Sequence, residues 1–379
     1  LPAGMLTDRV GGRVVTISML LLTAIPCFFL TQVSGYGALL VLAFLVGFAG
    51  NLFSVGIAWN AAWWPKERQG FALGVFGAGN VGASVTKLLV VLLPTIIAST
   101  AGAMYLGIFP GGWRIFPAFY TVALVVVAIL TFLIVPRHDK MNGAGKPLGE
   151  MLAPLKHVRV WRFSLYYAAV FGAYVALSAW LPKYYVDNFG VELQVAALLT
   201  ATFIFPASLL RPVGGWFSDK YGARRVMYWT FGVMLATTGI LMMPNGHLVI
   251  DQADGTQSEH LAYAIGIVPF ALLVFVLGCA MGVGKAAVYK HIPEYFPDNV
   301  GSVGGLVGMF GGLGGFVLPP LFAYTKVWSG FPSSTFFVLF LLTAACFIWM
   351  HWTVVHMLHR ESPDLARHLE TPVATATVR

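Results

Sequence analysis

Charged side chains are scarce in this sequence. Asp, Glu, Lys and Arg make up 10% of its 379 residues, whereas hydrophobic residues make up 58%. A soluble domain carries about 25% charged residues, so this chain could not cover a water-facing surface of its size. The shortage of charge excludes an ordinary soluble enzyme, a disordered chain and a coiled coil. It indicates an all-α membrane protein, in which the 42 glycines allow close helix packing.

Metal ligands and thiol pairs are also few. The three cysteines, Cys27, Cys279 and Cys346, lie in apolar runs without a CxxC spacing, which argues against a disulfide framework or a metal site. The histidines near the C-terminus are not spaced to form a metal-binding face beside a carboxylate. No nucleophile elbow, P-loop or HExxH pattern is present. We therefore expect neither an enzyme nor a bound metal or cofactor.

Long apolar runs dominate the rest of the chain. A helix needs about 20 apolar residues to cross a bilayer. Ten runs reach this length, at residues 14–33, 37–60, 70–98, 114–135, 162–182, 194–217, 223–244, 262–288, 300–324 and 332–355. The first run is too long for a signal peptide and lacks a small-residue cleavage pattern. The sequence predicts a multi-pass membrane protein.

The positions of Lys and Arg orient these spans. If the segment before the first span is cytoplasmic, sixteen of the 23 basic residues face the cytoplasm and three face the opposite side. This asymmetry favours the cytoplasmic (inner) membrane with both termini inside. The basic residues sit in short loops, not in one patch. The net charge of +8 therefore indicates a lipid bilayer as partner and no nucleic acid.

The longest predicted cytoplasmic loop divides the chain. Residues 137–161 are polar and basic and contain Gly and Pro, as in a linker between two bundles. We expect a partial N-terminal bundle of four spans at residues 1–136 and a C-terminal bundle of six spans at residues 162–357. Residues 358–379 are expected to form a disordered cytoplasmic tail.

An internal repeat relates the two predicted bundles. Gly, Asp, a basic residue, Gly and Arg recur in the same order, 211 residues apart, in two loops next to spans. The first loop contains Gly4, Asp8, Arg9, Gly11 and Arg13, and the second contains Gly215, Asp219, Lys220, Gly222 and Arg224. The second copy follows the second span of its bundle, but no span precedes the first copy. We therefore expect that the first two spans are missing from a fold of two pseudo-symmetric six-helix bundles.

Both loops resemble the signature loop of the major facilitator superfamily. Two Gly-rich stretches, at residues 70–82 and 301–315, are similar to the paired signatures of the nitrate/nitrite porter family (NarK-like). This resemblance implies a transporter that takes part in nitrate assimilation and carries a substrate-binding arginine in each half. In the repeat, Arg211 lies opposite the position before Leu1, so we expect an arginine there as well.

Each Gly-rich stretch places small residues on one helix face. The expected faces are formed by Gly301, Gly305, Gly308, Gly312 and Gly315 in the second stretch, and by Gly74, Ala78 and Gly82 in the first. Such faces can serve simple helix packing. They can also allow helices to slide and narrow a pore around a small ligand, and both interpretations stay open.

Arg211 is the strongest candidate for a binding residue on physical grounds. It lies eight residues, or about 12 Å of helix, from Asp219 at the expected cytoplasmic edge. A charge at that depth is costly unless it faces a cavity or a partner. The span 194–217 contains no acidic residue. The planar guanidinium matches a planar oxyanion such as nitrate or nitrite. A structural arginine bonded to backbone carbonyls is the alternative.

Aromatic and polar residues in other spans complete the predicted site. Tyr167 and Phe171 are one helical turn apart, which by itself also fits a plain core stripe. The resemblance implies that both contact the anion, that Phe53 is a pocket aromatic and that Asn80 is the signature asparagine. Gly311, in the second Gly-rich stretch, is placed in the same substrate-binding set.

Cations outnumber acids inside the predicted spans. The cations are Lys87, Arg211, Lys285 and Lys290, against Glu294 as the only nearby acid. A cavity with this balance attracts anions and repels cations. Lys285 aligns with Phe53 in the repeat and would reach the cavity from the other bundle. Lys87 and Glu294 are candidates for coupling, while Lys290 could pair with Glu294 one turn later.

These observations predict secondary active transport of nitrate or nitrite by alternating access. An inside-negative membrane opposes anion entry by about 2.3 kcal/mol per charge per 100 mV, so uptake needs a cotransported cation or a counter-anion. The Lys285-x-x-x-Tyr289-Lys290 stretch favours a proton symporter. A nitrate/nitrite antiporter is the alternative, followed by an anion channel or another anion transporter of the same fold.

Overall fold

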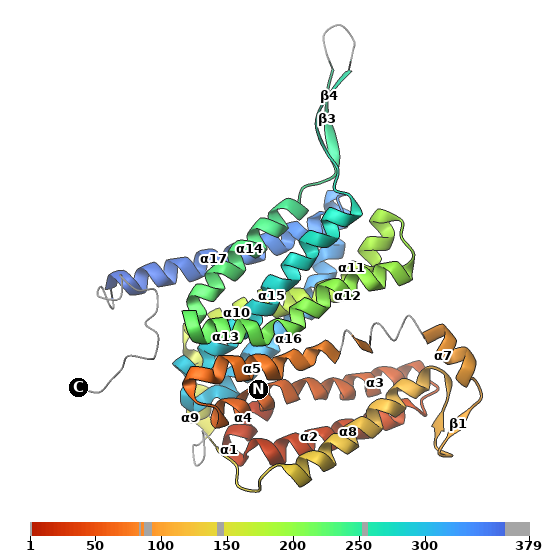
Figure 1. Ribbon diagram of the computed structural model, residues 1–379, viewed down its shortest axis with the longest axis vertical. Helices are drawn as coiled ribbons and strands as arrows, with labels where there is room; N and C mark the ends of the chain where they lie inside the picture. Colours follow the sequence, from red (N-terminus) through yellow and green to blue (C-terminus); the bar gives the residue numbers. More distant parts are fainter. Residues whose placement is uncertain (1, 83–84, 87–92, 142–147, 252–256, 361–379) are drawn as a thin grey trace.

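The protein is a bundle of long helices (Figure 1). The computed structural model describes residues 2–82, 85–86, 93–141, 148–251 and 257–360. In this part of the chain, eight helical segments are long and apolar enough to cross a membrane. They are Gly12–Leu30, Tyr36–Trp63, Gly112–Ile134, Val158–Phe189, Leu193–Tyr221, Ile267–Tyr295, Pro297–Ser329 and Ser334–His356. The predicted multi-pass helical class is confirmed.

The first half of the chain contributes short and long helices and one small hairpin. Its helices are α1 (Pro2–Val10), α2 (Gly12–Leu30), α3 (Tyr36–Val46), η1 (Gly47–Gly50), α4 (Asn51–Trp63), η2 (Lys66–Arg68), α5 (Gln69–Ala78), η3 (Gly79–Val81), α7 (Leu93–Thr100), η4 (Gly112–Arg114) and α8 (Ile115–Ile134). Strands β1 (Met104–Tyr105) and β2 (Phe109–Pro110) pair antiparallel. The helices α9 (Leu148–Leu152) and η5 (Ala153–Lys156) follow in the predicted linker.

The second half is built from longer helices. They are α10 (Val158–Tyr167), the π-helical turn η6 (Ala168–Gly172), α11 (Ala173–Phe189), α12 (Leu193–Leu209), α13 (Arg211–Tyr221), α14 (Ala223–Leu241), α15 (Ile267–Tyr295), η7 (Pro297–Asn299), α16 (Val300–Ser329) and α17 (Ser334–Arg360). Strands β3 (Gly246–Asp251) and β4 (Gln257–Tyr263) pair antiparallel. They form a hairpin that projects from the helices in Figure 1, between the predicted spans 223–244 and 262–288.

Two of the ten predicted spans are not among the eight apolar segments. The span 223–244 corresponds to α14, in which Arg224 and Arg225 lower the hydropathy, and this helix packs against both α15 and α17. The span 70–98 is described only in part, through segments that include α5, η3 and α7. The count of ten therefore stays a prediction.

One predicted span is broken in the middle. Residues 194–217 fall into α12 and α13, which are separated by Leu210 with φ −82° and ψ 0°. Pro206 and Pro212 lie on either side of this break. Because proline has no N–H to donate to the preceding turn, the two prolines weaken the helix around Leu210, although Leu210 still donates to Pro206 and Gly214 to Leu210. Arg211 consequently becomes the first residue of a new helix.

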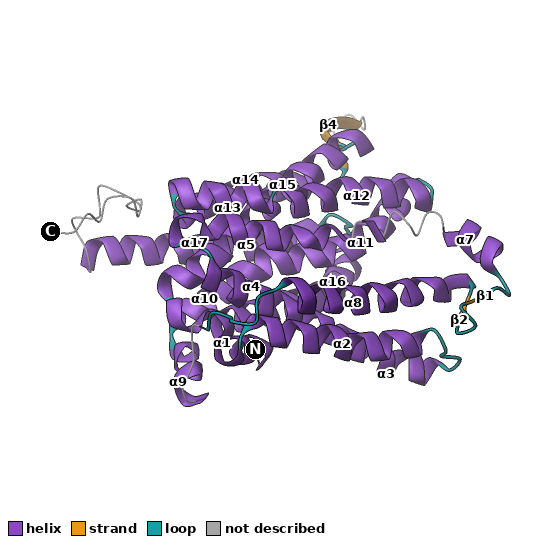
Figure 2. Cartoon of the chain, turned by 60° about the horizontal axis from the view of Figure 1, so that its bottom comes forward, coloured by secondary structure: helices purple, strands orange, loops and turns teal. Residues whose placement is uncertain are grey.

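Helices from the two halves cross one another. α5 packs along α13, and α16 packs against α1 and α4 (Figures 1 and 2). A Cβ on Gly4 would lie 2.0 Å from the carbonyl oxygen of Gly301, and a Cβ on Gly215 would lie 2.0 Å from that of Gly70. The two crossings are related by the internal repeat, and only glycine permits these distances.

The Gly-rich faces differ from the predicted ones. On α16, the glycines that approach neighbouring atoms include Gly301, Gly304, Gly308, Gly311, Gly314 and Gly315, while Gly312 has nothing within 4 Å. On the first stretch, Gly70, Gly74 and Gly77 make the close approaches, and Gly82 has nothing within 4 Å. Several of these glycines lie against the large side chains of Tyr289, Tyr167 and Arg211. The spacing of glycines in the sequence does not show which side chains they meet.

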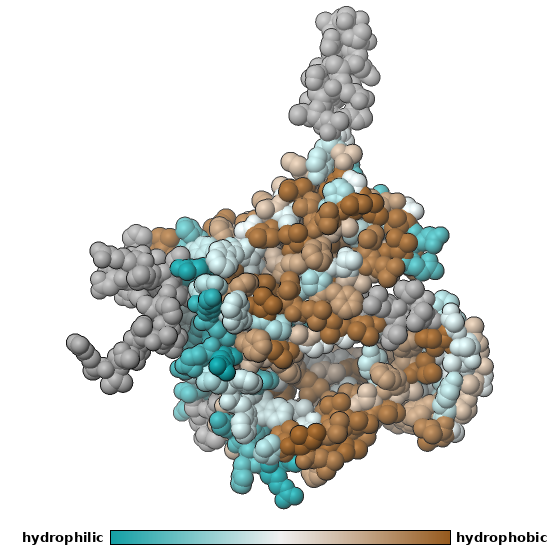
Figure 3. Space-filling model, in the orientation of Figure 1, coloured by the Kyte–Doolittle hydropathy of each residue, from teal (hydrophilic) through white to brown (hydrophobic). Residues whose placement is uncertain are grey.

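The outer surface of the helices is largely apolar. Figure 3 shows hydrophobic residues along the flanks of the bundle and hydrophilic residues gathered at the end near α9 and the N-terminus. On α8, the exposed fractions of Phe132, Leu133 and Ile134 are 55%, 69% and 73%. Large apolar side chains on this scale fit contact with lipid.

Candidate functional site

Arg211 is buried at the centre of the molecule, with 1% of its surface exposed. Its Nη1 donates to the carbonyl oxygen of Gly77 at 2.9 Å, and its Nη2 donates to the hydroxyl oxygen of Tyr167 at 3.1 Å. Its Nε is buried without a hydrogen-bond partner among the described residues. The guanidinium is therefore held in place by the protein, and its Nε–H lacks an acceptor among the described residues.

Aromatic rings from both halves surround the guanidinium. The ring of Phe53 stacks with Tyr167 at 6.5 Å and with Phe171 at 6.3 Å, and the Arg211 Cζ lies 5.1 Å from the Phe53 ring centroid. The ring of Tyr289 meets Tyr167 edge-on at 4.7 Å. The structure thus brings together Phe53, Tyr167, Phe171 and Arg211, four residues of the predicted set.

The helices that carry these residues depart from regular α geometry beside the site. The π-helical turn η6 starts directly after Tyr167 and contains Phe171. The 3-10 turn η1 precedes Phe53 by three residues, and η3 contains Asn80. π-helical turns are frequent at functional sites, because they turn side chains away from their usual helical positions.

A second buried cation lies next to the aromatic cluster. Lys285 is 0% exposed, and its Nζ donates to the carbonyl oxygen of Ala207 at 3.0 Å. The same Nζ lies 3.1 Å from the ring centroid of Tyr174 and 5.8 Å from that of Phe171. The predicted position of Lys285 beside the cluster agrees with these contacts.

Two glycines make room for the site. A Cβ on Gly77 would lie 2.6 Å from the Arg211 Cζ, and a Cβ on Gly311 would lie 2.5 Å from the Tyr167 ring. The Nδ2 of Asn80 is buried without a hydrogen-bond partner among the described residues. Asn80 is in η3, which packs against α12, the helix that leads into Arg211.

The site carries positive charge that the described protein groups do not balance. Arg211 and Lys285 bond to carbonyl and hydroxyl oxygens, and neither contacts a carboxylate in the described part of the chain. Two buried cations repel each other and lose their hydration. A small anion among Arg211, Lys285 and the aromatic rings would offset both effects.

The chain matches a known family of membrane transporters. The family model of the Major Facilitator Superfamily matches residues 1–250 and 185–377. The chain is 61% identical over 369 residues to a probable nitrate/nitrite antiporter, NarK1, of Thermus thermophilus, covering 97% of this chain and 82% of the relative. The chain belongs to the NarK-like porters of the major facilitator superfamily.

Other relatives of this NarK-like porter are more distant. It is 30% identical to the nitrite extrusion protein of Bacillus subtilis (strain 168), covering 95% of this chain and 83% of that protein. Among solved structures, the fucose transporter FucP in the outward conformation matches with a TM-score of 0.69 at 15% identity, over 93% of this chain and 85% of that chain. The likeness to FucP shows the major facilitator fold.

The two signature aspartates of the porter join its halves. Asp8 Oδ2 accepts hydrogen bonds from the backbone N–H of Gly301 at 2.9 Å and of Ser302 at 3.3 Å, at the start of α16. Asp219 accepts from the backbone N–H of Gly70 at 2.9 Å and of Phe71 at 2.8 Å, at the start of α5. Each aspartate therefore caps a helix of the other half, where the positive end of the helix dipole favours a carboxylate.

The signature segments of the porter are not open loops, which corrects the prediction. Residues up to Val10 and Tyr221 belong to α1 and α13, and the next helices begin at Gly12 and Ala223. Gly11 and Gly222 alone separate the helices, with φ of 99° and 86°, which only glycine adopts easily. A chain reversal of one residue leaves the rest of each signature free to be helical.

The basic signature residues lie around these turns. The Arg13 Nη2 donates to the carbonyl oxygen of Phe132 at 2.8 Å, and the Arg224 Nη2 donates to the Tyr295 hydroxyl at 3.1 Å. The Nζ of Lys220 lies 5.0 Å from the ring centroid of Trp216, and Arg9 is exposed. None of these described contacts joins the Arg211 cluster.

The predicted coupling residues fall outside the Arg211 cluster or outside the described residues. Glu294 is exposed, nine residues beyond Lys285 on α15, or about 13 Å along the helix. Its Oε1 lies 3.8 Å from the Lys290 Nζ, which is closer, at 2.8 Å, to the Oδ1 of Asp219. The predicted Lys290–Glu294 pair is thus extended by Asp219. Lys87 lies outside the described residues.

Sequence reasoning missed several residues that the structure places at the site. Tyr289 is 1% exposed, and its hydroxyl donates to the carbonyl oxygen of Gly304 at 3.1 Å. Its position four residues after Lys285 was a usable signal, because both then share a face of α15. Gly77, which seats the guanidinium, and Phe76, which stacks with Phe53 at 5.8 Å, gave no distinct signal.

Proposed function

We propose that this protein transports nitrate and nitrite across the cytoplasmic membrane by alternating access. The observation that carries the proposal is the buried guanidinium of Arg211, which bonds to Tyr167, keeps its Nε without a partner and lies in the same aromatic cluster as Lys285. The names of the relatives, a probable nitrate/nitrite antiporter and a nitrite extrusion protein, support the same substrates.

In the proposed mechanism, the anion neutralises the two cations. Arg211 offers planar donors to an oxyanion, and the rings of Phe53, Tyr167 and Phe171 confine it to a flat slot. Bound anion lowers the repulsion between Arg211 and Lys285, so that the bundles at residues 1–136 and 162–357 can close over it. Without the anion, closure would bring two unbalanced charges into a dry environment.

The same proposal assigns the sides of the membrane. The Lys and Arg distribution puts the signature turns, the linker 137–161 and both ends of the chain in the cytoplasm. The Gly4–Gly301 and Gly70–Gly215 crossings and the Asp8 and Asp219 caps then close the cytoplasmic side. Transport requires these contacts to open and reform in each cycle.

Exchange of nitrate for nitrite is the coupling mode that we favour over proton symport. The relative that is 61% identical is named an antiporter. In the described part of the chain no carboxylate contacts Arg211 or Lys285, so the cluster offers no acidic proton carrier. Exchange of two monovalent anions moves no net charge and needs no proton.

Proteoliposome transport tests both parts of the proposal. Vesicles loaded with nitrite are expected to take up external nitrate at a saturable rate that a pH gradient does not change. Vesicles without internal nitrite are expected to take up little. Uptake driven by a pH gradient into nitrite-free vesicles would instead establish the proton symport predicted from the sequence. Uptake that does not saturate and passes current would indicate a channel and contradict both.

A further inference from the structure

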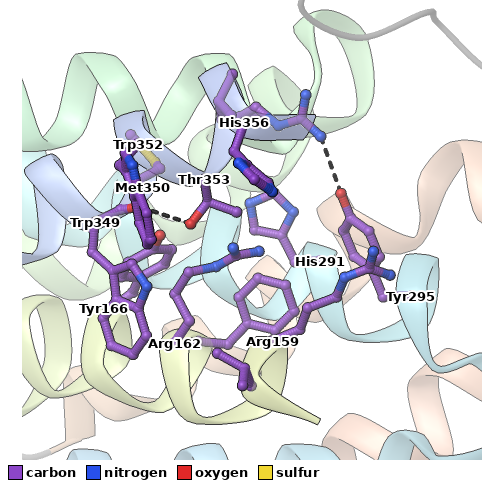
Figure 4. A pocket seen from close by; sticks show the side chains of 14 residues that line it. Arg159, Arg162, Tyr166, His291, Tyr295, Trp349, Met350, Trp352, Thr353 and His356 are labelled. Carbon is purple, nitrogen blue, oxygen red and sulfur yellow. Dashed lines mark hydrogen bonds between the residues drawn. The ribbon is translucent and has the colours of Figure 1, made fainter. Parts of the chain in front are cut away.

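A cavity lies at the end of the bundle that is proposed to face the cytoplasm, apart from the Arg211 cluster. It has a volume of about 260 Å³ and is enclosed by α10, α14, α15 and α17. Arg159 and Arg162 reach it from α10, and Trp352 and His356 reach it from α17 (Figure 4). The proposed transport mechanism assigns no role to this cavity, and Arg224 is its only lining residue from the signature segments.

Three guanidinium groups line the cavity. Besides Arg159 and Arg162, Arg224 takes part, and its Nη2 donates to the Tyr295 hydroxyl at 3.1 Å. The Cζ of Arg159 lies 5.4 Å from the Tyr295 ring centroid, and that of Arg162 lies 5.6 Å from the Phe163 ring centroid. Neither Arg159 nor Arg162 forms an ion pair with a carboxylate in the described part of the chain. The wall of the cavity therefore carries three cations, while the Glu294 carboxylate lies 3.9 Å from the Nδ1 of His291, which also lines it.

Buried polar atoms on the cavity wall lack partners. The Nε of Arg162 and the hydroxyl oxygen of Tyr166 are both buried and have no hydrogen-bond partner among the described residues. The side chain of Tyr166 is 2% exposed. Native proteins rarely leave such donors unsatisfied, so these atoms point to a ligand with several acceptor oxygens.

The rest of the wall is aromatic and continues to the outer surface. Trp349 and Thr353 line the cavity on α17, and Trp352 beside them is 67% exposed. Tryptophan is typical of the interface between lipid headgroups and water. The ligand therefore meets both a cationic wall and an aromatic wall that opens toward the membrane surface.

We propose that this cavity binds a phosphate group, either the headgroup phosphate of an anionic phospholipid or a soluble phosphate compound. Arg159, Arg162 and Arg224 provide the charge, and guanidinium groups match phosphate oxygens with paired donors. The Tyr166 hydroxyl and the Arg162 Nε provide two further donors. The proposal depends on the proposed orientation of the bundle but not on the identity of the transported anion.

Thermal unfolding and native mass spectrometry of the purified full-length protein test this site. The probes are dioctanoyl phosphatidylglycerol, the zwitterionic dioctanoyl phosphatidylcholine, glycerol phosphate and inorganic phosphate. We expect phosphatidylglycerol to bind and stabilise the protein and phosphatidylcholine to do neither. Stabilisation by phosphatidylglycerol alone assigns a lipid headgroup, and equal stabilisation by glycerol phosphate assigns a soluble phosphate. Equal effects of the two lipids, with none from the free phosphates, would refute the site.

Variants separate this site from general attraction to a basic surface. Arg162→Gln is expected to weaken phosphatidylglycerol binding about tenfold, as expected for the loss of a charge-assisted hydrogen bond. Arg225→Gln, one residue beyond Arg224 and outside the cavity lining, is the matched control and is expected to bind normally. Because Arg162 is half-buried, Arg159→Gln at an exposed position provides a second variant with the same expected direction. Equal binding by the Arg162, Arg159 and Arg225 variants would overturn the proposal, and nitrate-dependent stabilisation in the Arg162 variant should stay normal.

Discussion

At the scale of single residues, the proposed preference for anions rests on the arrangement around Arg211. The guanidinium is fixed by Gly77 and Tyr167 and stacked on Phe53, so it is ordered before a ligand arrives. A donor that is already in position loses little freedom on binding. Lys285 adds charge nearby without a directional match to an oxyanion.

Arg211→Lys tests the role of the planar donor group. The substitution keeps the charge but removes the fork, so we expect nitrate affinity to fall about tenfold or more. Arg211→Ala, which also removes the charge, is expected to abolish uptake. Nitrate-dependent thermal stabilisation and proteoliposome uptake measure the two effects. Arg225→Lys is the control, and normal uptake by Arg211→Ala would contradict the proposed role.

Gly77→Ala tests whether transport depends on the position of the Arg211 guanidinium. The added methyl group would lie 2.6 Å from the Cζ and Nε of Arg211 and must displace the side chain. We expect nitrate uptake to fall strongly while the protein still inserts into the membrane. Gly82→Ala, where a Cβ meets nothing within 4 Å, is the matched control. Equal uptake by the two variants would show that the guanidinium tolerates displacement.

At the scale of helices, the two aspartate caps hold the halves together at one end of the bundle. Asp219 accepts hydrogen bonds from two backbone N–H groups at the start of α5 and forms an ion pair with Lys290 at 2.8 Å. Asp8 accepts a hydrogen bond from the backbone N–H of Gly301 at the start of α16. Each carboxylate is almost fully buried, so its bonds are not weakened by water. The helices also approach closely through glycine at both crossings.

Asp219→Asn is expected to weaken the contact between the two halves at this end of the bundle. The substitution removes the ion pair with Lys290 and one acceptor for α5, which we expect to cost about 1–3 kcal/mol of stability. Thermal unfolding in detergent measures the effect. Asp187→Asn removes the more exposed pairs with Lys183 and Lys326 and is expected to cost about 1 kcal/mol or less. Equal losses in the two variants would argue against a special role for the caps.

At the scale of the whole molecule, the distribution of Lys and Arg supports the proposed orientation in the membrane. The signature turns lie at the hydrophilic end near α9 and the N-terminus (Figures 1 and 3). The hairpin β3–β4 projects from the bundle away from that end (Figure 1). An anion that crosses this structure meets aromatic rings and two cations at the centre. In the proposed exchange, the direction of net flux is set by the anion gradients, since exchange of two monovalent anions moves no net charge.

Thiol labelling tests the orientation. In a background without the three native cysteines, Lys183→Cys and Arg68→Cys place single thiols at exposed positions that the Lys and Arg distribution puts on opposite sides. A membrane-impermeant maleimide applied to intact cells is expected to label position 183 and to label position 68 only after permeabilisation. The reverse pattern would invert the proposed topology.

The prediction from sequence was most successful where the physical signal is strong and local. Arg211 stood out because a charge among apolar residues has few explanations, and the structure gives it no carboxylate partner among the described residues. On α16, Gly304 and Gly311 contact neighbouring side chains although they are outside the predicted glycine face. The spacing of glycines indicates a stripe but not which neighbour the stripe meets. Tyr289 was missed as a site residue because its ring meets Tyr167, 122 residues earlier in the sequence.

The sequence alone determined the membrane class, the repeat and the positive charge of the interior, because apolar length, local order and a buried charge can each be read without knowing contacts. Only the tertiary structure decided that Asp8 and Asp219 cap helices of the opposite half, that Gly77 leaves room for the guanidinium and that three arginines line one cavity. These features depend on residues far apart in the chain, whose approach is set by how the helices cross.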